Sequence, residues 1–528
     1  MYDLVIRKGI VIDGTGAAGF PGDVAVEGDV IVAAGDLGDE KGRTEIDASG
    51  QVVCPGFIDL HSHSDIMLLA EPDGAPKVMQ GVTTDVMGQD GYSAAPIRRD
   101  LIPEYRQFLS ALAGNPDLDW DWETMDGYLS RFDGATSMNV ASMVGHGTVR
   151  WNVLGTASKP ADRCDLDRMG ESIEQAFAEG ATDVSYGLIY VPSLFANHEE
   201  LSYVGRLVQR LGGAVVYHIR NESDFVLESL DEVLQVARDT GVRTHISHFK
   251  VTGARNWDRA EEALARVEGA LADGLDVTFE QYPYPSGNTM LSAILPPWVL
   301  EGSQEEILAR LADPSLRPRI QRDVEHGVGR WQSFGIIAAW NIAVSSVGSE
   351  RNRDAIGRNL RDLAGEAGTT PLEVAIRLLL EEELNVGMII FHQSEEVLRR
   401  LMKHPRGGFG TDGVIGKRPH PRMYGTFPRV LGHYVREEKA LRLEEAIRKS
   451  TSVAADRLRL SDRGRIAPGM AADLVVFDPI RIADTATYEN PHQYPVGVNW
   501  VLVNGVPVVK EGRHTAARPG RALRPGLG

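Results

Sequence analysis

Two histidines end an apolar run in the sequence GFIDLHSHSD, which covers residues 56–65. Side chains alternate between faces along a β-strand, so His61 and His63 share one face at the point where the apolar residues stop. Imidazoles placed together at the end of a strand are typical ligands of a divalent metal ion. The motif therefore raises the hypothesis of a metal site.

Polar side chains end seven further apolar runs along the chain. They are Asp90, His146, Tyr190, His218, His248 with Lys250, Tyr282 and Asp412. A single histidine at a strand end is more often a hydrogen-bonded structural residue than a ligand. The combination of imidazoles and carboxylates, however, matches the donors that Zn²⁺ and similar cations prefer, provided that the fold brings the strand ends together.

The elements that must position these residues are short apolar strands alternating with amphipathic helical stretches. Eight candidate strands end near GFIDLHSH, GVTTDVMG, NVASMVGH, DVSYGLIY, AVVYHIR, RTHISHFK, DVTFEQYPY and GGFGTDG. Stretches such as LDEVLQVARDTG separate them, which is typical of βαβ units. We therefore predict an α/β fold with a (β/α)8 TIM-like barrel, in which reactive groups gather at the carboxyl ends of the strands.

The domain boundaries follow from changes of pattern. Residues 1–54 and 464–528 are rich in short β-runs and predict one small β-sandwich built from both chain ends, with a surface tail from Arg513. Residues 55–425 form the predicted barrel, and 426–463 a helical connection. The long gap between strands seven and eight predicts an inserted subdomain or lid, at about 285–345.

Composition limits the function classes. The chain has 528 residues, 43% of them hydrophobic, and a net charge of -19, which argues against nucleic acid or an anionic membrane as partner. It contains neither a membrane-span pattern nor a signal-peptide core, and its two cysteines favour a reducing compartment. We expect a soluble cytoplasmic protein that acts on a small molecule; homo-oligomerisation is left open.

Several phrases resemble one known family. PGFIDLHSHSD, followed by GVTT and later by TDG, resembles the amidohydrolase superfamily. MVGHGTVR, ISHFKVTG, YPYPSGNTML and above all HPRMYGTFPRVLGHY are similar to the N-acyl-D-amino-acid deacylases, or D-aminoacylases. These phrases span nearly the whole chain. The resemblance implies a metal-dependent hydrolase of N-acyl-D-amino acids.

Carried over position by position, the resemblance implies that His61, His63, His218 and His248 are metal ligands and that Asp412 is both ligand and general acid/base. One departure concerns GQDG, residues 88–91, where the family usually has a ligating cysteine in place of Asp90. A carboxylate can bridge two cations, whereas the loss of a thiolate removes one source of zinc preference. The alternative is that Asp90 is only a turn residue.

The resemblance also implies substrate contacts. Lys250, Tyr190, Tyr282 and Arg422 match substrate-binding positions, and Lys250 shares a strand face with His248. Asn288 stands where the family usually has serine. For His146 we expect either a role in stabilising the oxyanion or the orientation of a neighbouring group. Arg220 and Glu222, in YHIRNES, are expected to form an ion pair that orients an imidazole.

Two other functions are considered. A cyclic-amide hydrolase of the hydantoinase, dihydropyrimidinase or dihydroorotase kind would use the same barrel, but such enzymes commonly bridge two metals with a carboxylated lysine, and no lysine stands at the corresponding strand end. A non-catalytic scaffold would be expected to have lost ligands. The four histidines and Asp412 favour an enzyme.

Overall fold

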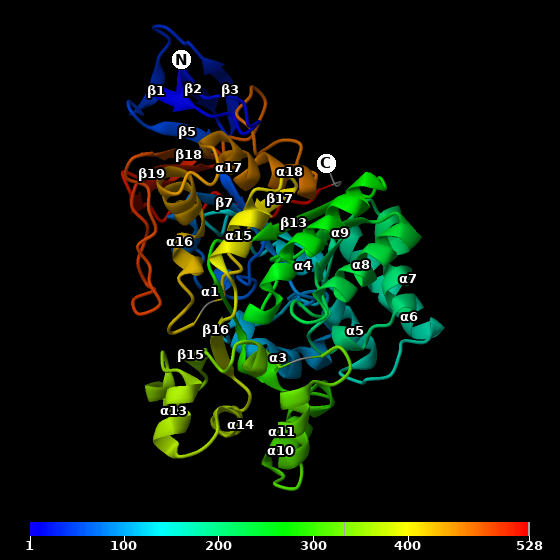
Figure 1. Cartoon of the computed structure of the whole chain (residues 1–528). Coiled ribbons are helices and arrows are strands. Elements are labelled where there is room, and N and C mark those ends of the chain that lie inside the picture. The colour runs from blue at the N-terminus through cyan, green and yellow to red at the C-terminus, as the bar shows by residue number, and fades with distance from the viewer. Residues whose placement is uncertain (332, 415, 526–528) are drawn as a thin grey trace.

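The two ends of the chain build one sheet at the same end of the molecule, where the blue N-terminal and red C-terminal strands lie side by side (Figure 1). A computed structural model describes residues 1–331, 333–414 and 416–525. Its nine-stranded sheet has the order β21-β20-β19-β18-β5-β1-β2-β3, with β4 beside β1. The strands are β1 (Tyr2–Val11), β2 (Phe20–Glu27), β3 (Val30–Gly35), β4 (Gly42–Asp47), β5 (Val52–Pro55), β18 (Leu474–Phe477), β19 (Val498–Val503), β20 (Val506–Lys510) and β21 (Arg513–His514).

The antiparallel pairing of β5 with β18 joins the two chain ends, with Val53 opposite Val476. Alternate residues such as Ile6, Val24 and Leu474 pack in a separate apolar cluster of this sheet. Burial of one face of each strand is the physical reason that segments more than 400 residues apart form one unit. Strands from both chain ends thus lie in one sheet.

Parallel strands occur at all eight places that the sequence predicts. They are β6 (Phe57–Asp59), β7 (Val82–Met87), β8 (Asn139–Ser142) continued by β9 (Val144–Gly145), β10 (Val184–Gly187), β11 (Ala214–His218), β12 (Arg243–Ile246), β13 (Val277–Gln281) and β17 (Gly407–Phe409). They pair as β6-β7-β8 and as β17-β13-β12-β11-β10-β9. A 3.4 Å hydrogen bond from the Leu60 N–H to the Phe409 carbonyl links β6 to β17. The carboxyl ends of all these strands therefore point to one side.

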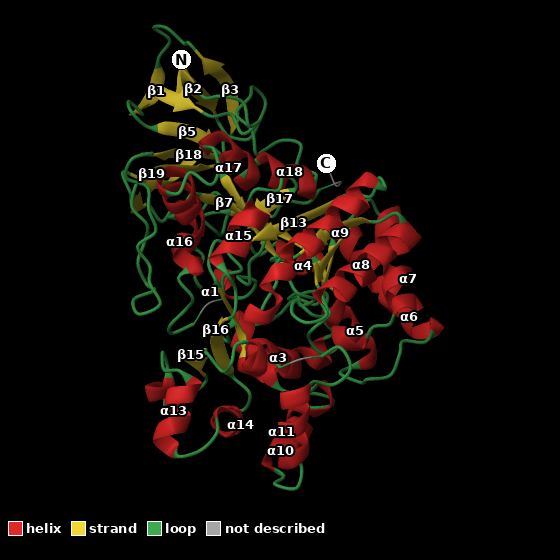
Figure 2. Ribbon diagram, in the orientation of Figure 1, coloured by secondary structure: helices red, strands yellow, loops and turns green. Residues whose placement is uncertain are grey.

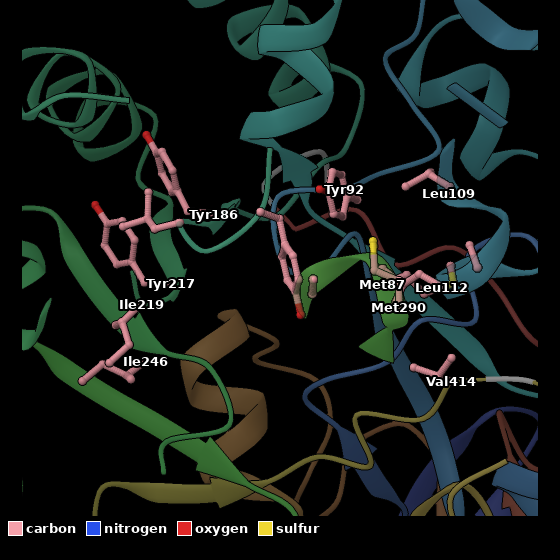
Figure 3. Close-up of a cluster of buried hydrophobic side chains, with 14 of the residues drawn as sticks. Met87, Tyr92, Leu109, Leu112, Tyr186, Tyr217, Ile219, Ile246, Met290 and Val414 are labelled. Carbon is pink, nitrogen blue, oxygen red and sulfur yellow. The ribbon is translucent and has the colours of Figure 1, made fainter. Parts of the chain in front are cut away.

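Helices cover the outside of these strands (Figure 2). They are α1 (Met67–Ala70), α2 (Ala75–Val78), α3 (Ile102–Ala113), α4 (Met125–Leu129), α5 (His146–Leu154), α6 (Arg163–Ala178), α7 (His198–Arg210), α8 (Val226–Thr240), α9 (Ala260–Ala272), α15 (Glu395–Met402), α16 (Arg422–Arg429), the π-helix Val430–Glu437, α17 (Leu443–Ser450) and α18 (Ser452–Leu458). In α8, Val226, Leu230, Val233 and Ala237 form the buried stripe. Among the strand side chains in the interior, the rings of Tyr186 and Tyr217 stack with centroids 4.9 Å apart (Figure 3).

The segment between β13 and β17 holds a separate, antiparallel sheet at the end of the molecule opposite the N-terminal strands (Figure 1). Its elements are β14 (Ser286–Met290), α10 (Gln304–Ala312), α11 (Arg317–His326), α12 (Phe334–Ile337), β15 (Ile342–Val347), α13 (Leu360–Ala367), α14 (Pro371–Glu381) and β16 (Val386–Phe391). The boundary predicted at residue 345 is wrong, because β16 is the central strand that pairs with both β14 and β15.

The C-terminal tail is not confined to the surface as expected. The Val140 N–H donates to the Arg521 carbonyl, and the Leu523 N–H donates to the Val140 carbonyl. The tail thus satisfies backbone groups at the edge of β8, and Ala522 is buried there. Cys54 and Cys164 are unpaired. None of the helices in the described ranges is both long and apolar enough to cross a bilayer.

Candidate metal centre

The predicted ligands lie at the carboxyl ends of four strands and in the loop after a fifth. His61 and His63 follow β6, Asp90 follows β7, His218 is the last residue of β11, His248 follows β12, and Asp412 follows β17. All six side chains are buried, none being more than 6% exposed. Asp90, His248 and Asp412 have positive φ angles, because the chain turns sharply after each of these strands. These turns direct the side chains toward the centre of the strand ends.

The Asp90 carboxylate lies among four imidazoles. Its Oδ1 atom is 3.6 Å from His61 Nε2 and 3.4 Å from His248 Nε2. Its Oδ2 atom is 3.7 Å from His63 Nε2 and 3.3 Å from His218 Nδ1. Burial alone would raise the pKa of Asp90, but the imidazoles hold it well below its usual value. Asp90 is therefore an ionised carboxylate whose two oxygens both face the histidines, with His248 Nε2 3.4 Å from each of them.

Asp412 lies against the His61 and His63 side of this cluster. Its Oδ1 atom is 3.3 Å from His63 Nε2 and 3.8 Å from His61 Nε2. Its Oδ2 atom is 2.8 Å from Arg422 Nη1. Burial would raise the pKa of Asp412, whereas the Arg422 guanidinium and His61 hold it far below its usual value. The carboxylate is thus ionised and able to accept a proton.

The donor set fits a divalent cation. Three overlapping groups have ligand atoms within 4.8 Å of one another: His61, His248 and Asp412; His61, His63 and Asp90; and Asp90, His218 and His248. His61 Nε2, Asp90 Oδ1 and both ring nitrogens of His218 are buried and have no hydrogen-bond partner among the described residues. Buried polar atoms without partners are costly, and a cation held between them would satisfy them.

Glu280, on β13, accepts hydrogen bonds from two of these histidines and so orients them. His61 Nδ1 donates to Glu280 Oε1 at 2.8 Å, and the backbone N–H of His248 donates to the same oxygen at 2.6 Å. The other carboxylate oxygen pairs with His245, the histidine that the sequence assigns to packing. A proton fixed on Nδ1 leaves the lone pair of His61 Nε2 free to bind a metal.

A buried lysine supports the site from beneath. Lys77, in α2, donates to Asp59, to Ser62 Oγ at 2.9 Å and to Thr411 Oγ1 at 2.7 Å, and lies 3.4 Å from Asp85 Oδ1. This network ties together the segments that carry His61 and Asp412. The ammonium group also balances two buried carboxylates.

Lys77→Ala is therefore expected to destabilise the protein by about 3–5 kcal/mol, because it leaves Asp59 and Asp85 buried without their cation. Denaturant unfolding followed by circular dichroism measures the change. Lys417→Ala, which removes an exposed pair with Glu350, is the control and is expected to cost less than about 1 kcal/mol. A cost as small as this for Lys77→Ala would contradict a supporting role.

A pocket with about 350 Å³ of empty space opens onto the candidate ligands. The side chains around it, apart from those ligands, include Tyr190, Glu222, Lys250, Tyr282, Asn288, Thr289, Phe334 and His392. The Lys250 ammonium donates to Glu222 Oε1 at 2.7 Å and lies 2.7 Å from His248 Nδ1. A positively charged group and several hydrogen-bonding groups thus face the carboxylate and imidazole cluster.

Comparison with known proteins agrees with this geometry. The sequence pattern of the Amidohydrolase family matches residues 44–509. The chain belongs to the amidohydrolase family.

Individual relatives cover almost the full length of the chain. The D-aminoacylase of Alcaligenes xylosoxydans xylosoxydans is 35% identical over 99% of this amidohydrolase and 97% of its own length. The N-acyl-D-glutamate deacylase of Bordetella bronchiseptica, solved with zinc and a phosphonate mimic of the tetrahedral intermediate, is 33% identical over 99% of each chain, with a TM-score of 0.85. A D-aminoacylase described as having a binuclear metal centre is 34% identical over 99% of this chain and all of its own, with a TM-score of 0.83.

The contacts of His146 distinguish between the two roles expected for it. His146 Nδ1 lies 2.9 Å from Ser193 Oγ and His146 Nε2 lies 2.9 Å from Glu200 Oε1, so neither nitrogen is free for an oxyanion. The strand before His146 ends at Gly145, and His146 is the first residue of α5. Of the two roles weighed for His146, only orientation of neighbouring groups agrees with these contacts.

The expected pair of Arg220 and Glu222 does not form. Arg220 instead contacts Glu232 and the carbonyls of Leu194 and Ala196, and Glu222 contacts Lys250. Arg220 and Glu222 lie beyond the end of β11 at His218, where strand geometry no longer places them on one face. Glu222 is nevertheless close to the ligands, since its Oε1 atom lies 3.2 Å from His248 Nδ1 and 3.7 Å from His218 Nε2.

Arg422 is near the site but does not line the pocket in the described part of the chain. It is fully buried, pairs with Asp412, and donates from Nη2 to the Asn288 carbonyl at 3.0 Å. The guanidinium lies over the Tyr282 ring, 4.3 Å from its centroid. Its observed contacts orient Asp412, while its Nε atom has no hydrogen-bond partner among the described residues.

Sequence reasoning missed Glu280 and His392. Glu280 lies on β13 one residue from the strand end, where an acidic residue in an apolar strand was a usable signal. His392 follows β16 of the inserted sheet, so the search for polar residues at the ends of parallel strands did not include it.

A larger, mostly apolar cavity lies beside the pocket and encloses about 810 Å³ of empty space. Tyr190 lines both the pocket and the larger cavity, and its hydroxyl group lies 2.9 Å from Thr289 Oγ1. Tyr92, Phe108 and Met290 are among the residues around the larger cavity, and Figure 3 labels Tyr92 and Met290 in this region. The amidohydrolase therefore has apolar space next to its polar site.

Proposed function

We propose that this amidohydrolase is a metal-dependent deacylase that cleaves the acyl amide of N-acyl-D-amino acids, yielding a carboxylate and a free D-amino acid. The observation that supports it most is the Asp90 carboxylate, which has one histidine nitrogen from each of His61, His63, His218 and His248 within 3.3–3.7 Å. D-Aminoacylase and N-acyl-D-glutamate deacylase, to which the chain is similar over its whole length, act on substrates of this class.

The residues that would hold one or two divalent ions are His61, His63, Asp90, His218, His248 and Asp412. Zn²⁺ is the first candidate, because imidazole and carboxylate are among its usual ligands. A cation at this place supplies a hydroxide nucleophile at neutral pH and polarises the scissile carbonyl. The imidazoles of His63 and His218 are suited to bind the cation, since burial lowers the pKa of each and favours the neutral form that binds metals.

Asp412 is proposed to move the proton. Its Oδ1 atom faces the histidine cluster, while Oδ2 is held by Arg422. The carboxylate accepts a proton during attack on the carbonyl and returns it to the leaving nitrogen, because an amide nitrogen leaves only when protonated. Arg422 keeps the group ionised and oriented before the reaction.

Lys250, Tyr190, Tyr282 and Asn288 are proposed to bind the substrate. The Lys250 ammonium group is suited to bind the α-carboxylate of the substrate, because it lies in the pocket. Its present partner, Glu222, is placed so that the two carboxylates can share the ammonium group. Tyr282 accepts a hydrogen bond from Gln393 at 2.7 Å, which leaves its own O–H free to donate. The adjacent apolar cavity offers space for an apolar part of the substrate.

The finer features of the fold are part of the proposal. The eight parallel runs are inferred to close into a (β/α)8 barrel, supported by the hydrogen bond between Leu60 and Phe409. The curled sheet from both chain ends is inferred to form a β-sandwich, and the cytoplasmic location remains a prediction.

A cyclic-amide hydrolase is the alternative function. Asp90 lies at the centre of the cluster, where such enzymes commonly have a carboxylated lysine, and this disfavours a cyclic substrate. A substrate panel separates the two functions after metal analysis of the purified protein.

The metal-loaded protein is expected to hydrolyse N-acetyl-D-methionine at least about tenfold faster, by kcat/KM, than the L-enantiomer, and not to hydrolyse dihydrouracil. Release of the free amino acid is measured by a coupled or chromatographic assay. Activity on dihydrouracil alone would contradict the proposal. A purified chain without any bound divalent ion would support the scaffold reading instead.

A further inference from the structure

His392 is a buried histidine of the pocket that the proposed mechanism does not use. It directly follows β16 and belongs to the inserted sheet rather than to the parallel strands. Its side chain is 5% exposed and lines the same pocket as Lys250, Tyr282 and Asp412. The segment after the inserted sheet therefore contributes an imidazole to the pocket that the candidate metal ligands also line.

The hydrogen bonds of His392 fix which nitrogen carries the proton. Nδ1 lies 3.0 Å from the Ile390 carbonyl oxygen. A carbonyl can only accept, so Nδ1 must donate, and the neutral ring then has its lone pair on Nε2. Burial lowers the pKa of His392 to about 4, so the ring is neutral near pH 7. Nε2 is a hydrogen-bond acceptor without a partner among the described residues.

The chain around His392 is held in place. Its carbonyl oxygen accepts a 2.8 Å hydrogen bond from the Gly253 N–H and a 3.4 Å bond from Trp257 Nε1. Both donors belong to the segment that follows Lys250. Phe334 packs edge-on against the imidazole, with ring centroids 6.1 Å apart. The imidazole ring therefore has a defined position, in which its Nε2 atom has no hydrogen-bond partner among the described residues.

A second free acceptor lies on the neighbouring strand. Asn288 Nδ2 donates to the Met388 carbonyl at 2.7 Å, so the side-chain oxygen Oδ1 is the free atom, and it too is buried without a hydrogen-bond partner in the described ranges. β14 and β16 are paired here, with Asn288 opposite Ile389. Gly287 lies directly against His392 and Tyr282, since a Cβ atom on it would approach His392 Cε1 to 3.1 Å and the Tyr282 hydroxyl to 3.3 Å.

We propose that His392 is a specificity residue, whose Nε2 atom accepts a hydrogen bond from an N–H or O–H group of the substrate outside the scissile amide. This inference rests on the proposed function, because it concerns the substrate of that same pocket. A substrate with such a donor satisfies a buried acceptor that an apolar isostere leaves unsatisfied. The donor can belong either to the amino-acid side chain or to the acyl group.

Two matched pairs of substrates distinguish these sources. N-acetyl-D-glutamine and N-acetyl-D-methionine differ by a donor on the side chain, and N-glycolyl-D-leucine and N-propanoyl-D-leucine differ by a donor on the acyl group. In one pair, kcat/KM of the wild-type protein is expected to be about tenfold higher for the donor-bearing member. The pair that shows this ratio identifies the part of the substrate that faces His392.

Variants at position 392 test the residue itself. His392→Asn keeps an amide that can donate to Ile390 in place of Nδ1 but removes Nε2, so it is expected to reduce the ratio to about one. His392→Gln retains an acceptor near Nε2 and is expected to keep part of the ratio. His198→Asn, at a half-exposed histidine paired with Asp239, is the matched control and is expected to keep the whole ratio.

Ratios within twofold of one in both pairs for the wild-type protein would overturn the inference, whether or not any variant folds. So would a tenfold ratio that persists in His392→Asn. If the metal-loaded wild-type protein hydrolyses none of the four compounds, the proposed function fails, and calorimetric binding of the same compounds decides for His392: equal dissociation constants within both pairs overturn its role.

Discussion

Asp412→Asn is expected to lower kcat for N-acetyl-D-methionine by about 10²–10⁴-fold while the protein keeps its metal. The substitution preserves the shape of the side chain and one oxygen, but it removes the charge and the ability to accept a proton. The three remaining groups of this cluster, His61, His63 and Asp90, still offer a complete set of donors for a cation. Turnover should therefore fall far more than metal content.

Three measurements separate these effects. Elemental analysis gives the metal per chain, and steady-state kinetics give kcat and KM. Asp239→Asn, a surface carboxylate paired with His198, is the matched control and is expected to change none of the three. His218→Ala provides the contrast, because it should lose metal and turnover together. An Asp412→Asn variant as active as the wild type would refute the proton transfer.

The surroundings of Asp412 explain why its removal matters more than its acidity suggests. Arg422 lies 2.8 Å from Oδ2 and lowers the pKa of the carboxyl group, which makes it a weak base in the metal-free site. Ionisation at all relevant pH values, however, guarantees that the proton acceptor is ready.

The sequence alone allowed the metal cluster to be inferred, because its logic is simple. Parallel strands have their carboxyl ends on one side, so His61, His218 and His248 could be expected to meet once their strands were recognised. The inference needed neither exact strand bounds nor side-chain partners. Even Lys250 reaches the pocket, although β12 ends at Ile246 and the alternation argument used for it does not extend that far.

Hydrogen-bond partners could not be inferred in the same way. Arg220 is only two residues from His218, yet it contacts Glu232 because the chain leaves the strand direction after β11. His146 has the type and position of a catalytic residue, but Ser193 and Glu200 from other segments occupy both ring nitrogens. Such choices depend on which side chains the tertiary structure brings within about 3 Å, and strand periodicity contains no information about them.

The inserted sheet shows the same limit for the fold. A gap of more than 100 residues predicted an additional unit, but its end was placed too early, because β16 pairs with strands on both sides and only the pairing reveals it as the centre. His392 was overlooked for this reason. An insertion contributes residues to the site through its tertiary packing. The repeating pattern of strands and helices therefore does not indicate which residues these are.

Asp90→Asn is expected to lower the affinity for the metal by more than about 100-fold, beyond the 10- to 100-fold loss typical of residues that only support a ligand. Asparagine tolerates the positive φ of this position and has nearly the same shape, so the fold should be kept. It lacks a charge and has one acceptor oxygen instead of two. The two oxygen positions that face the four imidazoles can therefore no longer both bind cations.

Titration of the metal-free variant with Zn²⁺, followed by calorimetry, gives the affinity and the number of ions per chain. Asp90→Cys is the informative companion, because a thiolate restores one negative donor at the position where related deacylases usually have cysteine. It is expected to regain tight binding of at least one ion, with a stronger preference for Zn²⁺ over Mn²⁺. If Asp90 were only a turn residue, Asp90→Asn would bind the same number of ions as the wild type with the same affinity, since asparagine is well suited to such a turn.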